Sequence, residues 1–204
     1  MTESNPNARL ETFCDGVFAI ALTLLIIDIK PPDPERIQSN AEFWRALRNL
    51  APSVFSFLLS FGIILISWVN HHAALRLMAR SSASFVYANG LLLLTIVVIP
   101  FPTSLLGTFL FTEHAAPAVV LYNAVLGAQT VGWIAVGRSA LKHELAKNET
   151  AAKTIRVNTR NGYFGLVFYL LLAVLAFWFP RTSAAINTAS WIFWLVLGVR
   201  IKHD

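Results

Sequence analysis

The sequence predicts an all-α membrane protein with six transmembrane helices per chain. Hydrophobic residues make up 56% of the 204 residues, and charged residues only 13%, about half the share found in soluble domains. The mean hydropathy is +0.60. A globule of 22.6 kDa has too little interior to bury so many apolar side chains, so the composition excludes both a soluble and a disordered chain.

Long stretches without charged residues place five of the helices. The expected spans are residues 51–75, 84–110, 115–137, 161–180 and 183–200. Each is close to the ~20 residues that a helix needs to cross a bilayer. Pro100 and Pro102 fall inside the stretch 84–110 and should kink or break its helix. Residues 1–204 are therefore expected to form a single transmembrane domain.

The sixth candidate span is residues 9–29, whose uncharged core, Gly16 to Ile27, is only twelve residues long. That is too short for a helix that faces lipid along its whole length. One interpretation is a signal peptide, but no basic region precedes the core and residues 28–32 form a poor cleavage site. We favour a helix whose polar ends are shielded by protein, as in a helix that lines a pore.

The connection at residues 30–50 begins with Pro31, Pro32 and Pro34, and its second half, 41–50, is expected to be a short helix. Phe43, Trp44 and nearby arginines would suit a helix lying in the membrane interface. A plain extension of the following span is the alternative. The sequence leaves both open.

The positions of Lys and Arg predict the orientation. Eleven of them fall on the side of the two termini and five on the opposite side. The positive-inside rule therefore predicts a multi-pass protein of the cell membrane with cytoplasmic N- and C-termini. The net charge of +5 is then explained by topology and by contact with lipid headgroups, and no nucleic-acid partner is expected.

Motifs for enzymatic chemistry are missing from the sequence. It contains one cysteine and no pairing of a nucleophile with a base in a known catalytic motif. His71 and His72 are adjacent, and adjacent side chains on a helix point about 100° apart, which does not suit chelation of one metal. We predict neither an enzyme nor a bound metal or cofactor.

The first helix carries an apolar stripe and a carboxylate on different faces. At 100° per residue, one face collects a set of residues that we call the first-helix stripe: Phe13, Gly16, Ile20, Thr23, Leu24 and Ile27. Asp15 lies about 140° from Ile20. The second span ends at a similar depth with possible partners for Asp15, namely Trp68, Asn70, His71 and His72. A carboxylate at membrane depth must be paired or protonated, so a structural hydrogen-bond network is favoured over a proton relay or an ion site.

These residues carry a resemblance to a known family. Arg9-x-x-x-Phe13-Cys14-Asp15-Gly16 resembles the R-x-x-x-F-S-D signature that opens the first helix of the transmembrane protein 175 family of potassium channels. Trp68-x-Asn70-His71-His72 is similar to the polar end of the second helix of that family. The six-span length matches the single-repeat prokaryotic members. Cys14 stands where the family has Ser, and a thiol is a weaker hydrogen-bonding group than a hydroxyl.

The resemblance implies a homotetramer in which the first helices surround a central pore. It places the hydrophobic pore layers at Ile20, Leu24 and Ile27 and the pore threonine at Thr23, with potassium as the permeant ion. It also implies a structural polar network of Arg9, Cys14, Asp15, Trp68, Asn70, His71 and His72. The alternative function is a proton-coupled secondary transporter, in which Asp15 and His71 or His72 would carry protons.

Overall fold

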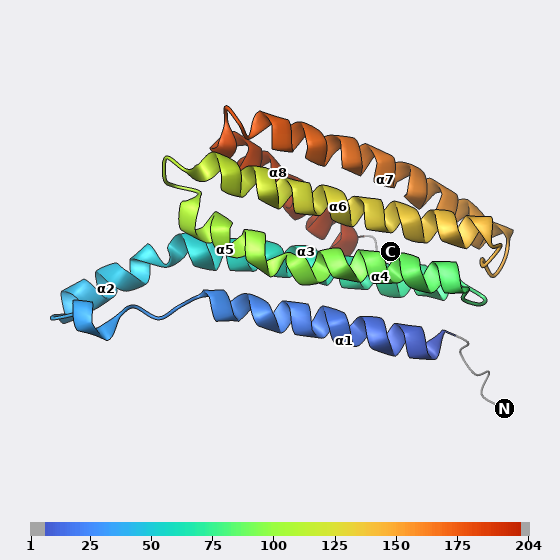
Figure 1. Ribbon diagram of the computed structural model, residues 1–204, viewed down its shortest axis with the longest axis horizontal. Helices are drawn as coiled ribbons and strands as arrows, with labels where there is room; N and C mark the ends of the chain where they lie inside the picture. The colour runs from blue at the N-terminus through green and yellow to red at the C-terminus, as the bar shows by residue number, and fades with distance from the viewer. Residues whose placement is uncertain (1–6, 201–204) are drawn as a thin grey trace.

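The chain folds into a bundle of long antiparallel helices, seen side-on in Figure 1. The computed structural model describes the backbone of residues 7–200 and the side chains of residues 7–192. Within these residues, no strand forms beyond a single isolated bridge, so the predicted all-α class is confirmed. The elements in chain order are α1 (Ala8–Leu24), the 3₁₀ segments η1 (Leu25–Asp28) and η2 (Pro34–Arg36), α2 (Asn40–Asn49), α3 (Ala51–Arg76), α4 (Ala83–Val98), α5 (Pro100–Phe109), α6 (Ala115–Lys142), α7 (Glu149–Leu175) and α8 (Pro180–Arg200).

Four helical segments of the described chain are long and apolar enough to cross a membrane. They are Ala8–Asp28, Asn40–Arg76, Ala83–Phe109 and Ala115–Lys142. The third is interrupted, since α4 ends at Val98 and α5 begins at Pro100. Ile99, between the two helices, keeps helical torsion angles (φ −52°, ψ −39°), so the break reflects the missing amide hydrogen of Pro100, which cannot donate to a carbonyl of the preceding turn. The predicted interruption by Pro100 and Pro102 is confirmed.

Several helix bounds differ from those expected from the charge-free stretches. The α-helix of the first segment ends at Leu24, and a 3₁₀ turn continues it to Asp28. Helix α7 ends at Leu175, ahead of the expected 180, because Pro180 opens a new helix and residues 176–179 form the turn before it. Helix α6 continues to Lys142, beyond the expected span end at 137. Charged residues mark where the membrane-buried part of a helix ends, but the helix itself can continue past them.

The short helix expected at residues 41–50 is present as α2, capped by the Ser39 hydroxyl, which accepts a hydrogen bond from the Glu42 amide. It projects from the start of α3 beyond the ends of the other helices (Figure 1). Phe43 and Trp44 are exposed on it. Whether this helix rests on a membrane surface stays a prediction.

Close approach of helices holds the centre of the bundle together. α6 packs most extensively against α7 and α4. A Cβ atom added to Gly132 of α6 would lie 2.8 Å from the Cα of Leu92 in α4, and one added to Gly162 of α7 would lie 2.9 Å from a side-chain carbon of Ile134. Glycine at these positions lets the backbones touch, which increases dispersion contacts between the helices.

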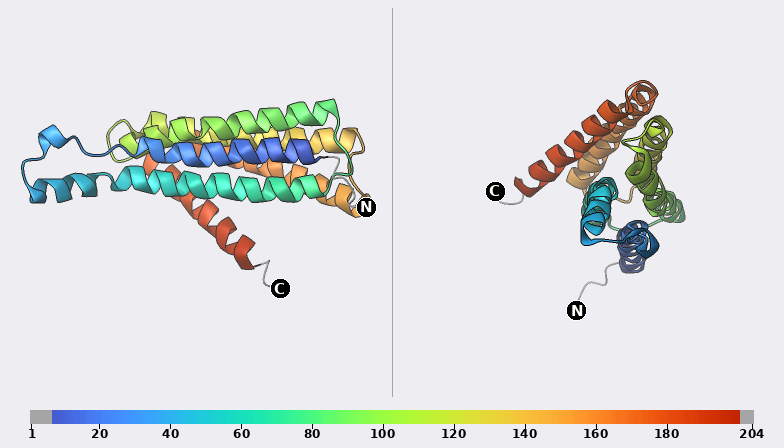
Figure 2. Two further views of the ribbon diagram at one scale, coloured as in Figure 1. Left: turned by 90° about the horizontal axis from the view of Figure 1, so that it is seen from below. Right: turned by 90° about the vertical axis from the view of Figure 1, so that its left-hand side faces the viewer.

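Helix α1 lies at the edge of the bundle, alongside α3 and α4 (Figures 1 and 2). It contributes Cys14, Phe18 and Ala21 to the main hydrophobic core, and η1 adds Leu25. At the opposite edge α8 leaves the bundle at an oblique angle (Figure 2). Only one face of α1 is therefore covered within a single chain.

Candidate pore helix and its polar ladder

The first-helix stripe lies within the exposed face of α1 and η1, which also includes Ile26. The side chain of Ile20 is 59% exposed and that of Ile27 is 65% exposed, whereas Leu25, on the other face, is 1% exposed. The remaining stripe residues, Phe13, Gly16, Thr23 and Leu24, are also exposed. A continuous apolar surface of this kind on a helix calls for a second apolar partner, which is lipid or another protein chain.

Thr23 is the one hydroxyl-bearing residue of this stripe. Its Oγ1 donates a hydrogen bond to the carbonyl oxygen of Ile20 at 2.9 Å. The hydroxyl hydrogen is thereby directed back along the helix, and the oxygen lone pairs remain free to accept. An oxygen ligand on an otherwise apolar surface is suited to contact a partly dehydrated cation.

Four polar side chains tie α1 to α3, and we call them the polar ladder: Glu11, Asp15, Trp68 and His72. The indole Nε1 of Trp68 donates a hydrogen bond to Asp15 Oδ1 at 2.8 Å. One turn nearer the N-terminus of α1, His72 Nδ1 lies 2.9 Å from Glu11 Oε1. The two helices are antiparallel, so the i, i+4 pair on α1 meets the i, i+4 pair on α3 in reverse order. The two contacts fix the rotation of α1 about its axis.

His71 is not part of this ladder and points into the core of the bundle. It is buried, and its Nε2 lies 2.8 Å from Asn89 Oδ1 of α4. Its ring also packs against Phe18 of α1 and Trp133 of α6, at ring-centre distances of 5.4 and 6.1 Å. His71 therefore joins four helices in the core and does not form a pair with Asp15.

The structure brings together only part of the predicted network. Asp15 bonds to Trp68 as expected, but the expected meeting of Asp15 with His72 is wrong, because His72 contacts Glu11 one turn away. Arg9 and Asn70 are exposed. Cys14 is fully buried among apolar side chains.

Sequence reasoning missed Glu11 and Asn89. Glu11 could have been found, since it precedes Asp15 by four residues just as Trp68 precedes His72 by four. No sequence signal placed Asn89 opposite His71.

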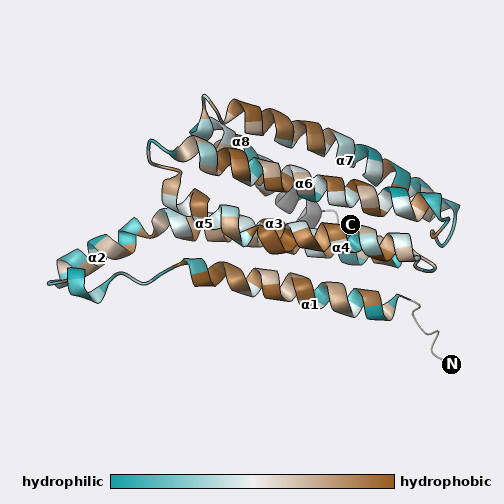
Figure 3. Cartoon of the chain, viewed as in Figure 1, coloured by the Kyte–Doolittle hydropathy of each residue, from teal (hydrophilic) through white to brown (hydrophobic). Residues whose placement is uncertain are grey.

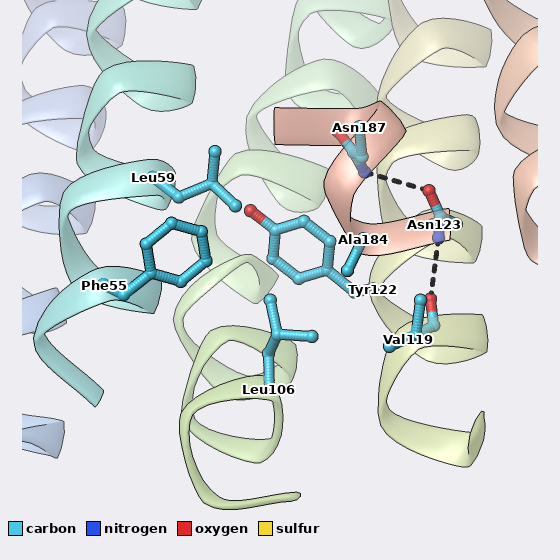
Figure 4. Close-up of a pocket in the computed structure, with 8 residues that line it drawn as sticks. All are labelled: Phe55, Leu59, Leu106, Val119, Tyr122, Asn123, Ala184 and Asn187. Carbon is cyan, nitrogen blue, oxygen red and sulfur yellow. Dashed lines mark hydrogen bonds between the residues drawn. The ribbon is translucent and has the colours of Figure 1, made fainter. Parts of the chain in front are cut away.

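A small cavity lies inside the single chain. The cavity in Figure 4 lies between α3, α5, α6 and α8 and has a volume of about 10 Å³. That is the minimum for one water molecule. Its wall is mostly apolar, and Asn187 Nδ2 in it donates to Asn123 Oδ1 at 2.9 Å. Within the described part of the chain, no group of three or more metal-ligating side chains occurs.

Comparison with known proteins decides the family. The family pattern for the endosomal/lysosomal potassium channel TMEM175 matches residues 9–100. A potassium channel of Chamaesiphon minutus is 36% identical over 176 residues, which cover 86% of each chain. The chain belongs to the TMEM175 family. A second TMEM175-like relative, a potassium channel of Streptomyces collinus, is 34% identical over 89% of this chain and 88% of its own length.

Solved structures agree with this assignment to TMEM175. The crystal structure of a lysosomal potassium-selective TMEM175 homologue from Chamaesiphon minutus has a TM-score of 0.82 to this chain. The two are 33% identical, and the match covers 93% of this chain and 96% of the other. The recognised resemblance to the single-repeat prokaryotic branch is confirmed.

Proposed function

We propose that the protein is a potassium-selective ion channel, a homotetramer in which four copies of α1 surround a central pore. The observation that carries this proposal is the contrast between the two faces of α1: Leu25 is 1% exposed and Ile20 is 59% exposed. In a tetramer the exposed face would line the pore. The relatives named as potassium channels cover most of the chain, which supports the ion and the function.

The side chains of the stripe suggest how conduction is controlled. Four copies of Ile20, Leu24 and Ile27 would form three apolar rings. An α-helix rises 1.5 Å per residue and a 3₁₀ helix about 2 Å, so adjacent rings would be separated by roughly 6 Å. Rings without oxygen ligands exclude water when narrow, and the pore would then be closed by dewetting.

Selectivity in this mechanism comes from the cost of dehydration. Ions would cross the widened rings with part of their water shell removed. Potassium holds its water less tightly than sodium and loses less free energy on entering. The hydroxyl oxygen of Thr23, one per subunit, would replace some of the lost water. This predicts a preference for potassium that is weaker than that of a filter built from carbonyl oxygens.

The polar ladder would hold α1 in the rotation that points the stripe at the pore. Asp15 is engaged by Trp68 on the face opposite Ile20, which supports a structural role over a proton-carrying one. If α1 rotated about its axis, the first-helix stripe would turn away from the pore and toward neighbouring helices. Assembly should therefore depend on the ladder more strongly than ion preference does.

The proposed topology uses the whole chain as one six-span domain, with both termini and the basic connection between α6 and α7 in the cytoplasm. Residues 161–180 would form the fifth span, and the exposed aromatic residues Phe177, Trp178 and Phe179 near its end would meet the outer headgroups. The bilayer and three further copies of the chain are the expected partners, potassium is the permeant ion, and no cofactor is required.

Two measurements on the purified protein test the proposal. The mass of the detergent-solubilised complex should equal four chains, since one copy of the stripe encloses no pore. Single-channel recording in planar bilayers should show discrete openings, each of which passes many potassium ions. A monomer without channel openings, or slow flux that follows a proton gradient and requires Asp15, would contradict the channel and favour a transporter.

A further inference from the structure

Helix α7 carries a straight row of exposed side chains that changes from basic to apolar along its length. We call it the α7 stripe: Lys153, Arg156, Arg160, Phe164, Val167 and Leu171. At 100° per residue these positions fall within about 80° of one another around the helix. All six side chains are exposed, and Phe164 and Leu171 are 69% and 63% exposed. Figure 3 shows the same change along α7, from hydrophilic near Glu149 to hydrophobic near Leu175.

The opposite face of α7 is used for packing. Ala151, Ile155 and Leu172 are buried, and Gly162 approaches Ile134 of α6. The orientation of the α7 stripe is therefore set by the helix pair, and the stripe faces away from the rest of the chain. A single exposed basic residue would need no explanation. Three basic residues in line with an exposed apolar row form a surface with a cationic part and an apolar part.

We propose that the α7 stripe binds an anionic phospholipid. Arg156 and Arg160 are one turn apart and would hold the phosphate through their guanidinium groups, which pair with phosphate oxygens in a bidentate manner. Lys153 lies one turn further from the apolar part, beside the exposed carboxylate of Glu149, and contributes less. The acyl chains would lie along Phe164, Val167 and Leu171.

The length of the stripe fits one leaflet. From Arg160 to Leu171 the helix rises roughly 16 Å, and half of the hydrocarbon core of a bilayer is about 15 Å. Tyr163, exposed beside the stripe where its charged part ends, is placed as an aromatic residue at the membrane interface. A soluble anion would match the charges but would leave the apolar row uncovered, so the two parts together favour a lipid.

The proposal takes from the proposed function only that residues 161–180 lie in the bilayer, and its test requires no ion flux. Native mass spectrometry of the detergent-solubilised protein would count bound phosphatidylglycerol against phosphatidylcholine with identical acyl chains. The double variant Arg156→Gln/Arg160→Gln should lose its preference for phosphatidylglycerol by on the order of thirtyfold, since each cation near an anionic headgroup contributes about fivefold. Arg156→Lys/Arg160→Lys keeps the charge but loses the bidentate pairing, so its preference should be lower than that of the wild type and well above that of Arg156→Gln/Arg160→Gln.

A matched control removes the same charge elsewhere at the same end of the bundle. Arg80 and Lys147 are exposed in the two loops that are joined by the hydrogen bond from the Lys147 amide to the Leu77 carbonyl, and neither residue lies on α7. Arg80→Gln/Lys147→Gln should leave lipid preference unchanged. Equal losses in both double variants, or none in Arg156→Gln/Arg160→Gln, would overturn the proposal.

Two further results would also overturn it. Competition by inorganic phosphate as strong as that by phosphatidylglycerol would show an anion site and not a lipid site. A changed mass of the assembled complex in Arg156→Gln/Arg160→Gln, with lipid binding intact, would show that the stripe contacts another copy of the chain.

Discussion

Replacing Trp68 with Phe tests the polar ladder with little other disturbance. Phenylalanine keeps an aromatic ring beside His72, whose ring centre lies 6.4 Å from that of the indole, and removes the Nε1–H that donates to Asp15 Oδ1. A hydrogen bond to a charged group contributes about 1.5–3 kcal/mol. Trp68 is 36% exposed, so water competes and we expect a value near 1 kcal/mol.

A double-mutant cycle isolates this contact. The variants are Trp68→Phe, Asp15→Ala and their combination, and the free energy of unfolding is followed by helical circular dichroism in mixed micelles. The coupling energy should be about 1 kcal/mol, well above the error of additive sites. Trp44→Phe provides the control, because Trp44 lies exposed on α2 at the other end of the bundle and should not couple to Asp15.

The cycle also separates the two roles considered for Asp15. If the ladder positions α1, Asp15→Ala should reduce the yield of assembled complex on size-exclusion chromatography, while the remaining channels keep their ion preference. A coupling energy of zero between Trp68 and Asp15 would refute the ladder. Normal assembly of Asp15→Ala together with a loss of proton-dependent flux would instead support the transporter.

Two other predictions concern packing and topology. Gly132→Ala should cost about 1–3 kcal/mol of unfolding free energy in the same assay, because the new methyl group would overlap Leu92 of α4. Gly127→Ala is the matched change at an ordinary contact distance and should be neutral or slightly stabilising; equal costs for both variants would contradict close packing of α4 on α6. Single cysteines placed in residues 140–156 of a Cys14-free protein should react only with cytoplasmic thiol reagents, and those in 30–50 only with external ones; the reverse would overturn the orientation.

Much of the fold could be predicted because apolar length and proline act locally. Pro100 lies at a helix start inside the stretch where a break was predicted, and the effect of proline on helical hydrogen bonding needs no tertiary information. The helix start at Pro180 was not predicted, since residue 180 was expected to end a span. Helix α7 ends at Leu175, before the end of the expected span at 180, because a charge-free stretch shows what lipid tolerates and not where helical hydrogen bonding stops. The change to a 3₁₀ helix at Leu25 also has no clear local signal.

The candidate site was only partly predictable. Helical periodicity correctly placed Asp15 on the face away from Ile20, and the antiparallel direction of the second span brought Trp68 to its depth. Predicting which side chains pair across two helices requires knowing the register of one helix against the other. A shift of one turn is enough to change the partner of His72 from Asp15 to Glu11. Burial of His71 against Asn89 depends on the position of α4, which the first two helices do not determine.

The central claim is that the exposed face of α1 lines a potassium pore. Potassium and sodium currents in planar bilayers, recorded for wild type, Ile20→Asn and Leu25→Asn, test it most directly. Ile20→Asn should hydrate the narrow apolar ring, so resting current should rise and potassium preference should fall. Leu25→Asn places an amide in the core, where the residue is 1% exposed, and should lower the yield of folded protein without raising the current. If Ile20→Asn changes neither conductance nor selectivity while Leu25→Asn changes both, the pore lies on the other face of α1 and the account is contradicted.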